Sequence, residues 1–182
     1  MAAPVDLSLP HHYTVRFAEL PPGNTGSRVR YYPGGETDGG RDGILIEVVP
    51  GHGAPWFGMI ADGYESPLAC SGLFAAPHAD RICVVAAGRA IEIDTTDPTR
   101  WIELPIFPVT HVVAVPALRA LVLCDFGYVT AWGANGVLWK TDLSPADGIV
   151  AIRLDGDVLR GVRSISYGDE NFTLDLETGR YL

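Results

Sequence analysis

The chain has 182 residues, of which 47% are hydrophobic and 19% charged, and this composition excludes an intrinsically disordered polymer. The 21 glycines and 14 prolines are more helix breakers than a helical bundle of this length tolerates. Thirteen basic and 22 acidic side chains give a formal net charge of −9, which repels phosphate backbones, so we expect no nucleic-acid partner.

The apolar runs are short, because Gly, Pro or a charge interrupts each of them well before the roughly 18 residues of a membrane span. Residues 1–20 lack the basic and apolar regions of an export signal. Cys83 and Cys124 lie inside apolar runs and Cys70 makes the cysteine count odd, which favours free thiols in a reducing compartment. We therefore expect residues 1–182 to form a single-domain cytoplasmic protein with no membrane partner.

The N-terminal part, residues 1–71, carries runs typical of strands at 14–20, 28–32, 44–49 and 56–60. Between them, the Gly- and Pro-rich segments 21–26 and 33–43 are typical of long surface loops. We expect an irregular β unit in this part of the chain.

The remaining residues, 72–182, contain a repeat of about 39 residues. Leu104, Leu143 and Leu182 end three similar segments and stand 39 residues apart. Pro77 and Pro116, which close the first apolar run in two of the segments, keep the same spacing. Such tandem self-similarity predicts three copies of one β unit.

Each copy has room for four short strands separated by turn residues. Residues 91–94 alternate apolar and polar side chains, which is typical of a half-buried strand. The apolar run 121–124 is instead typical of a strand covered on both faces. Asn135-Gly136 predicts a tight hairpin turn in which both residues have positive φ.

Four antiparallel strands repeated in tandem predict an all-β fold of propeller-like units, and a regularly spaced β-sandwich is the alternative. Three copies are fewer than the four or so blades of a closed propeller. Either residues 1–71 supply a divergent fourth blade, or an open half-propeller closes by forming a homodimer.

The segments PIFPVTHV at 105–112, AWGANGVLWKTDL at 131–143 with Asp147-Gly148, and FTLDLETG at 172–179 resemble the recurring segments of a bacterial family of small propeller-like proteins. The resemblance covers about the last 110 residues. It implies the propeller-like fold. Because the family has no assigned activity, the resemblance implies no catalytic residues.

The motifs that carry common chemistry are missing from the sequence. There is no G-x-x-x-x-G-K phosphate loop, no G-x-S-x-G nucleophile elbow, and neither C-x-x-C nor H-E-x-x-H for zinc. The pair His11-His12 would point to opposite faces of an extended segment, and Glu36, Asp38 and Asp42 lack the ligand order of a calcium loop. We expect no cofactor and no metal, and we assign no catalytic residue.

Aromatic residues beside turns form the best candidate site. Trp56 and Phe57 follow one Gly/Pro-rich turn, and Tyr64 and Glu65 lie in a second one, so these four residues are the predicted ligand- or partner-binding site. Trp56 is also typical of a core. Three other tryptophans fall at strand ends, where neighbouring units are expected to pack: Trp101, Trp132 and Trp139.

These features favour a non-catalytic cytoplasmic module that binds a protein partner through its loops. The alternative is a small-ligand-binding protein or a hydrolase-type enzyme that uses carboxylates on one face, with Asp62, Glu65, Asp94 and Asp125 as candidates. Carboxylates that converge in one pocket would favour the enzyme, and scattered carboxylates would favour the binding module.

Overall fold

The computed structural model describes residues 3–19, 29–34, 42–64 and 66–182. The bounds of the elements in these ranges are β1 (Val5–Asp6), β2 (Tyr13–Phe17), β3 (Val29–Tyr32), β4 (Gly43–Pro50), β5 (Trp56–Ala61), β6 (Gly72–Ala75), β7 (Arg81–Ala86), β8 (Arg89–Asp94), β9 (Trp101–Glu103), β10 (His111–Val115), the 3-10 helix η1 (Pro116–Leu118), β11 (Ala120–Cys124), β12 (Tyr128–Gly133), β13 (Gly136–Asp142), β14 (Gly148–Asp155), β15 (Val158–Ile165) and β16 (Gly168–Asp175). No helical segment within these ranges has the length and apolarity to traverse a bilayer.

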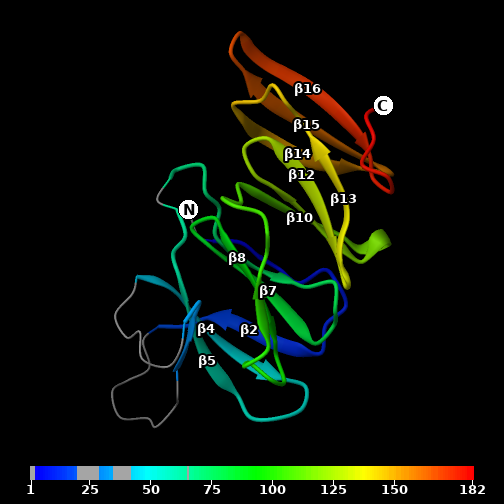
Figure 1. The fold of residues 1–182 in the computed structure, drawn as a ribbon. Helices are drawn as coiled ribbons and strands as arrows, with labels where there is room; N and C mark the ends of the chain where they lie inside the picture. Colours follow the sequence, from blue (N-terminus) through cyan, green and yellow to red (C-terminus); the bar gives the residue numbers. More distant parts are fainter. Residues whose placement is uncertain (1–2, 20–28, 35–41, 65) are drawn as a thin grey trace.

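The strands form four sheets that follow one another in chain order (Figure 1). Sheet I has the strand order β2-β4-β5-β3, sheet II β1-β6-β7-β8-β9, sheet III β10-β11-β12-β13 and sheet IV β14-β15-β16. From β6 onward, the strands within each sheet are antiparallel neighbours in sequence, and β1 is added to β6 in parallel. The predicted all-β class with antiparallel sheets is confirmed.

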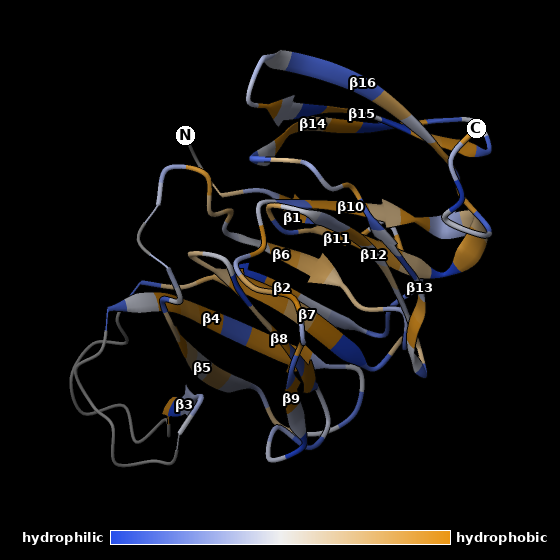
Figure 2. Ribbon diagram, turned by 45° about the horizontal axis from the view of Figure 1, so that its top comes forward, coloured by the Kyte–Doolittle hydropathy of each residue, from blue (hydrophilic) through white to orange (hydrophobic). Residues whose placement is uncertain are grey.

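Three hydrophobic clusters fill the spaces between consecutive sheets, and the central strands are correspondingly apolar (Figure 2). On β7, Ile82 and Val84 belong to the cluster between sheets I and II, whereas Cys83 and Val85 belong to the cluster between sheets II and III. The run 121–124 alternates in the same way between the second and third clusters, so its expected burial on both faces is confirmed. The molecule thus has four layers and three interfaces, whereas a two-sheet sandwich has one interface.

Strand β8 is more buried than its alternating sequence indicates. Its isoleucines pack between sheets I and II, but Glu92 and Asp94 are also buried, at 3% and 7% exposure. The Glu92 carboxylate accepts hydrogen bonds from Arg81 Nη1 and Trp132 Nε1, both at 2.8 Å. The expectation of a half-buried strand is therefore wrong, because the polar positions face protein partners instead of water.

One indole N–H crosses each of the three interfaces. Trp56 donates to the Thr95 carbonyl (2.8 Å), Trp132 to the Glu92 carboxylate (2.8 Å) and Trp139 to the Leu176 carbonyl (2.9 Å). Trp101 is half-buried and packs edge-to-face on Tyr32 between sheets I and II. The expected packing of Trp132 and Trp139 between neighbouring units is confirmed.

Two features of the sheets differ from regular four-stranded units. Within the described residues, sheet IV has three strands, and the place of a fourth strand is marked by a single bridge between Leu174 and Tyr181. In the described residues, the third copy therefore has three of the four expected strands, and the expectation of four strands in every copy is wrong for this copy. The N-terminal strands form sheet I as expected, with an irregularity: β3 lies parallel to β5 at the sheet edge.

The hairpin between β12 and β13 corrects the turn predicted at Asn135-Gly136. Gly133 pairs with Gly136, so Ala134 and Asn135 are the central residues, and only Gly136 has positive φ (+113°). Because β12 runs one residue farther than the sequence indicates, the loop moves one position toward the N-terminus. A turn with two positive φ values occurs instead between β7 and β8, at Ala87 (43°) and Gly88 (79°).

Candidate functional site

The four predicted site residues do not form one cluster. Trp56 is 8% exposed and belongs to the core between sheets I and II. Phe57 is half-buried at the start of β5, and Tyr64 lies beyond the far end of this strand, which is roughly 17 Å long at about 3.3 Å per residue. Glu65 lies outside the described residues.

Tyr64 instead belongs to a group of three aromatic rings, which we call the aromatic patch. Its ring lies edge-to-face with Phe107 at 6.2 Å and with Phe126 at 6.3 Å. Tyr64 follows β5, Phe107 lies between β9 and β10, and Phe126 lies between β11 and β12. The patch therefore joins connections that are far apart in the chain.

Backbone hydrogen bonds fix the segments that carry the patch. The Tyr64 amide donates to the Ala87 carbonyl (2.6 Å), and the Val109 amide donates to the Gly88 carbonyl (2.8 Å). Both segments are thus anchored on the positive-φ turn between β7 and β8. A Cβ at Gly88 would lie 2.8 Å from the Pro108 side chain, so glycine also permits this close approach.

The patch is apolar and open to solvent on a rigid support. Tyr64 is 43% exposed and Phe107 51% exposed, while Phe126 is half-buried against Tyr64. An aromatic ring removes more apolar surface from water when a partner covers it than most other side chains do. Rings held in place before binding lose little conformational entropy when a partner covers them. This arrangement suits recognition of another protein surface.

Sequence reasoning identified Tyr64 but missed Phe107 and Phe126. A signal for Phe126 was present, because it lies two positions after the buried run 121–124, at a turn position where polar residues are usual. Phe107 stands between prolines in the neighbouring connection and gives no signal of its own.

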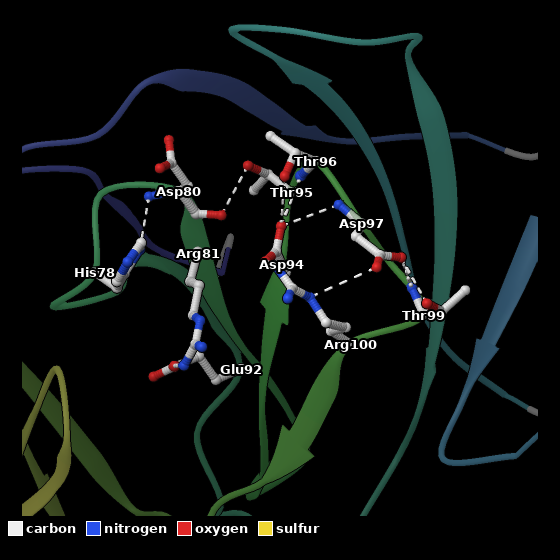
Figure 3. A network of polar contacts seen from close by, with 10 residues as sticks. All are labelled: His78, Asp80, Arg81, Glu92, Asp94, Thr95, Thr96, Asp97, Thr99 and Arg100. Atoms are coloured by element: carbon white, nitrogen blue, oxygen red, sulfur yellow. Dashed lines mark hydrogen bonds and ion pairs between the residues drawn. The ribbon is translucent and has the colours of Figure 1, made fainter.

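Asp94, a candidate catalytic carboxylate, is held in a closed polar network at the end of β8 (Figure 3). Its Oδ1 accepts hydrogen bonds from the Thr96 amide, the Thr96 hydroxyl and the Asp97 amide, at 2.8–3.0 Å, and its Oδ2 accepts one from Arg100 at 2.9 Å. Burial by itself raises the pKa of Asp94, but the hydrogen bonds outweigh burial and hold this pKa below its usual value. A carboxylate in this state is a weak general base at neutral pH.

Asp125 also stabilises a turn. Its Oδ1 accepts hydrogen bonds from the amides of Gly127 (2.9 Å) and Tyr128 (2.8 Å). Asp94 lies opposite the first residue of β7. The turn that contains Asp125 carries Phe126, which belongs to the aromatic patch, and this patch lies beyond the last residue of β7, at the other end of the strand. These two carboxylates therefore lie at opposite ends of the sheets and do not converge on one pocket.

The three thiols are fully or partly buried and of low reactivity. Cys83 and Cys124 are buried, Cys70 is half-buried, and all three are free. Burial raises the pKa of Cys70 to about 12 and the pKa of the other two thiols well above the usual value. Little of any thiol is ionised at neutral pH, so nucleophilic chemistry has no support here. In the described ranges, no group of three or more His, Cys, Asp or Glu residues could hold a metal ion.

No family model matches the chain, and no curated protein matches it. Among solved structures, one similar chain belongs to an S. cerevisiae complex of a Dbp5 variant bound to Nup159, a Gle1 variant, IP6 and ADP. The alignment covers 96% of this chain and 52% of the other, at 12% identity and a TM-score of 0.41. This chain therefore spans about half the length of the chain it matches, and at this TM-score the likeness carries no argument.

Proposed function

We propose that this protein is a non-catalytic interaction module that binds a protein partner through the aromatic patch. The observation that carries the proposal is the meeting of three rings from three separate connections, two of them exposed. Rigidly held aromatic side chains are among the residues that contribute most to affinity at protein interfaces.

The chemistry of the partner follows from the patch and from the charge of the protein. A patch of three rings is best covered by an apolar centre on the partner, because its exposed atoms offer little else to bind. The net charge of −9 favours approach of a basic surface. We infer a partner surface with an apolar centre and a basic rim.

The same proposal includes the wider fold and the cellular setting. We infer that sheets II to IV are repeated propeller-like blades and that sheet I is a divergent blade. The stacking of four sheets in chain order supports this reading. Three free thiols support a reducing, cytoplasmic setting.

The second candidate is a small-ligand-binding protein or a hydrolase-type enzyme that uses carboxylates on one face, and these carboxylates give it weaker support. Asp94 and Asp125 hold turns and lie apart. The pKa of Asp94 is lowered, whereas a general acid in a pocket needs a raised pKa at neutral pH. Asp62 lies two residues before Tyr64, and Glu65 is outside the described residues.

Affinity capture from cells of the native host tests the proposed function. The tagged wild-type protein is compared with the variant Tyr64→Ser/Phe107→Ser, which removes the two exposed rings of the patch. The control variant Val137→Ser/Leu138→Ser removes two apolar side chains of β13 that are 50% and 53% exposed. Thermal melting first establishes that all three proteins are folded.

We expect one partner protein to be retained by the wild type and by the control, and to fall by at least about tenfold with the patch variant. Size-exclusion chromatography with light scattering identifies self-association, because a homodimer would appear as doubled mass. Equal retention of all captured proteins by both variants would contradict the proposal.

A further inference from the structure

A second site lies along β3, the edge strand of sheet I. Two hollows of about 330 Å³ and 190 Å³ meet there, and the walls of both contain Arg30 and Pro98. The larger hollow is also lined by Trp56 and Phe57, and the smaller by Trp101. We call these two hollows the Arg30 groove. Two of the four site residues predicted from sequence thus belong to this groove and not to the aromatic patch.

Arg30 is the unusual residue of the groove. Four of the described arginines are half-buried, and three of them have acidic partners: Arg81 with Glu92, Arg89 with Glu103, and Arg163 with Glu170. The Arg30 guanidinium has no hydrogen bond or ion pair with any residue that the structure describes. A guanidinium has five N–H donors, and its partial removal from water without an acceptor is unfavourable. None of its nitrogens is fully enclosed, so a ligand in the groove can reach them.

Most other polar side chains of the groove already have partners, and the exception among the described residues is the hydroxyl of the half-buried Tyr31. The Trp56 indole donates to the Thr95 carbonyl, and the Tyr32 hydroxyl donates to the Pro98 carbonyl at 2.8 Å. The hydroxyls of Thr96 and Thr99 donate to Asp94 and Asp97 (Figure 3). The Asp97 carboxylate is also ion-paired with Arg100 at 3.5 Å. Among the described residues, the unused hydrogen-bonding capacity of the side chains of the groove is therefore that of the Arg30 guanidinium, with the Tyr31 hydroxyl beside it.

We propose that the Arg30 groove binds a ligand that has a single carboxylate and an aromatic or apolar body. The planar guanidinium matches both oxygens of a carboxylate, and the rings of Phe57 and Trp101 provide apolar walls on either side. One cation that no described residue pairs, set between apolar walls, matches the charge of a monoanion. A phosphate dianion would carry a second charge that the single Arg30 guanidinium does not compensate. A free aromatic acid and the C-terminus of a peptide both offer this chemistry.

Isothermal titration of the wild-type protein with 3-phenylpropionate tests the proposal. Two further probes separate the contributions: 3-phenylpropanamide has the same body without the charge, and acetate has the charge without the body. We expect a Kd of about 1 mM for the acid and at least about tenfold weaker binding of both other probes. A tripeptide ending in phenylalanine with a free carboxylate distinguishes the two sources, because tighter binding than the acid assigns a peptide and equal or weaker binding assigns a small acid.

Variants then locate the site. Arg30→Gln removes the charge and keeps most of the side-chain length, and Arg160→Gln is the matched control on sheet IV, where Arg160 is exposed and paired with Asp155. We expect the affinity for 3-phenylpropionate to fall by at least about tenfold in Arg30→Gln and to stay unchanged in the control. Any of three results would overturn the proposal: the wild type binds the acid and the amide equally, the acid does not bind at about 10 mM, or Arg30→Gln keeps the wild-type affinity. The comparison of acid with amide uses the wild-type protein, so it decides the matter even where Arg30→Gln fails to fold.

Discussion

Replacing Trp132 with phenylalanine tests how the buried Glu92 carboxylate is stabilised between sheets II and III. The Glu92 side chain is 2% exposed and accepts two hydrogen bonds, from Trp132 Nε1 and Arg81 Nη1. Trp132→Phe keeps an aromatic ring at the interface but removes one donor from the carboxylate. Trp139→Phe is the matched control, because its indole is equally buried but donates to a neutral backbone carbonyl.

The difference between the two variants can be worked out from the charge of the acceptor. A hydrogen bond to a charged group contributes about 1.5–3 kcal/mol, whereas one to a neutral group contributes about 0.5–1.5 kcal/mol. The loss of indole volume is common to both variants and largely cancels. Trp132→Phe should therefore lose about 1–1.5 kcal/mol more unfolding free energy than Trp139→Phe. For a protein of this size that difference lowers the Tm by roughly 2–6 °C.

Urea unfolding followed by circular dichroism measures these free energies, and Glu92→Gln completes a double-mutant cycle. When the acceptor at position 92 is neutral, Trp132→Phe should cost no more than Trp139→Phe does in the wild-type background. The reasoning is refuted if the two tryptophan variants lose the same free energy, or if Glu92→Gln leaves the cost of Trp132→Phe unchanged.

Three further predictions follow from the backbone, the carboxylates and the thiols. Gly136→Ala should lose about 1–3 kcal/mol of unfolding free energy, measured by thermal melting, and Gly127→Ala almost none. A Cβ would meet no atom within 4 Å at either position, but only Gly136 of the two has positive φ. Equal losses in the two variants would be inconsistent with this turn. Asp94 has a lowered pKa in the folded state, so the stability that its charge contributes is complete above the ordinary carboxyl pKa and is lost as the pH falls. The Tm of Asp94→Asn should therefore be below that of the wild type at pH 7, and the difference between the two Tm values should close below about pH 4. A difference in Tm that stays constant with pH would show that the charge is unimportant. Cys83 and Cys124 should react with a thiol reagent at pH 8 only after urea is added, and rapid labelling of either in the folded protein would contradict their burial.

The strand pattern was largely predictable, because local sequence carries it. The run 121–124 is apolar at every position and lies between two interfaces. Residues 91–94 show the limit of this reasoning. Alternation indicates which side chains share a face, but it does not indicate whether a polar face meets water or, as for Glu92, an arginine and an indole from other strands.

The candidate sites were less predictable, because they depend on contacts between distant segments. Trp56 and Tyr64 are eight positions apart in the sequence, yet β5 separates them in space. Tyr64 meets Phe107 and Phe126 only because the turn between β7 and β8 anchors two of the three connections. The Arg30 guanidinium, which has no partner in the described part of the chain, was equally hidden, because the pairing of a side chain is a property of the folded arrangement and not of the sequence.

Site-specific photocrosslinking in the native host tests most directly the central claim that the aromatic patch is a partner-binding surface. A photoreactive benzoylphenylalanine is introduced in place of Tyr64 in one strain and in place of Val150, which is 53% exposed on sheet IV, in a second strain. Mass spectrometry then identifies the products formed on irradiation. The account predicts one discrete crosslinked protein from position 64 and none from position 150. The absence of a specific product from position 64, or the same products from both positions, would contradict it.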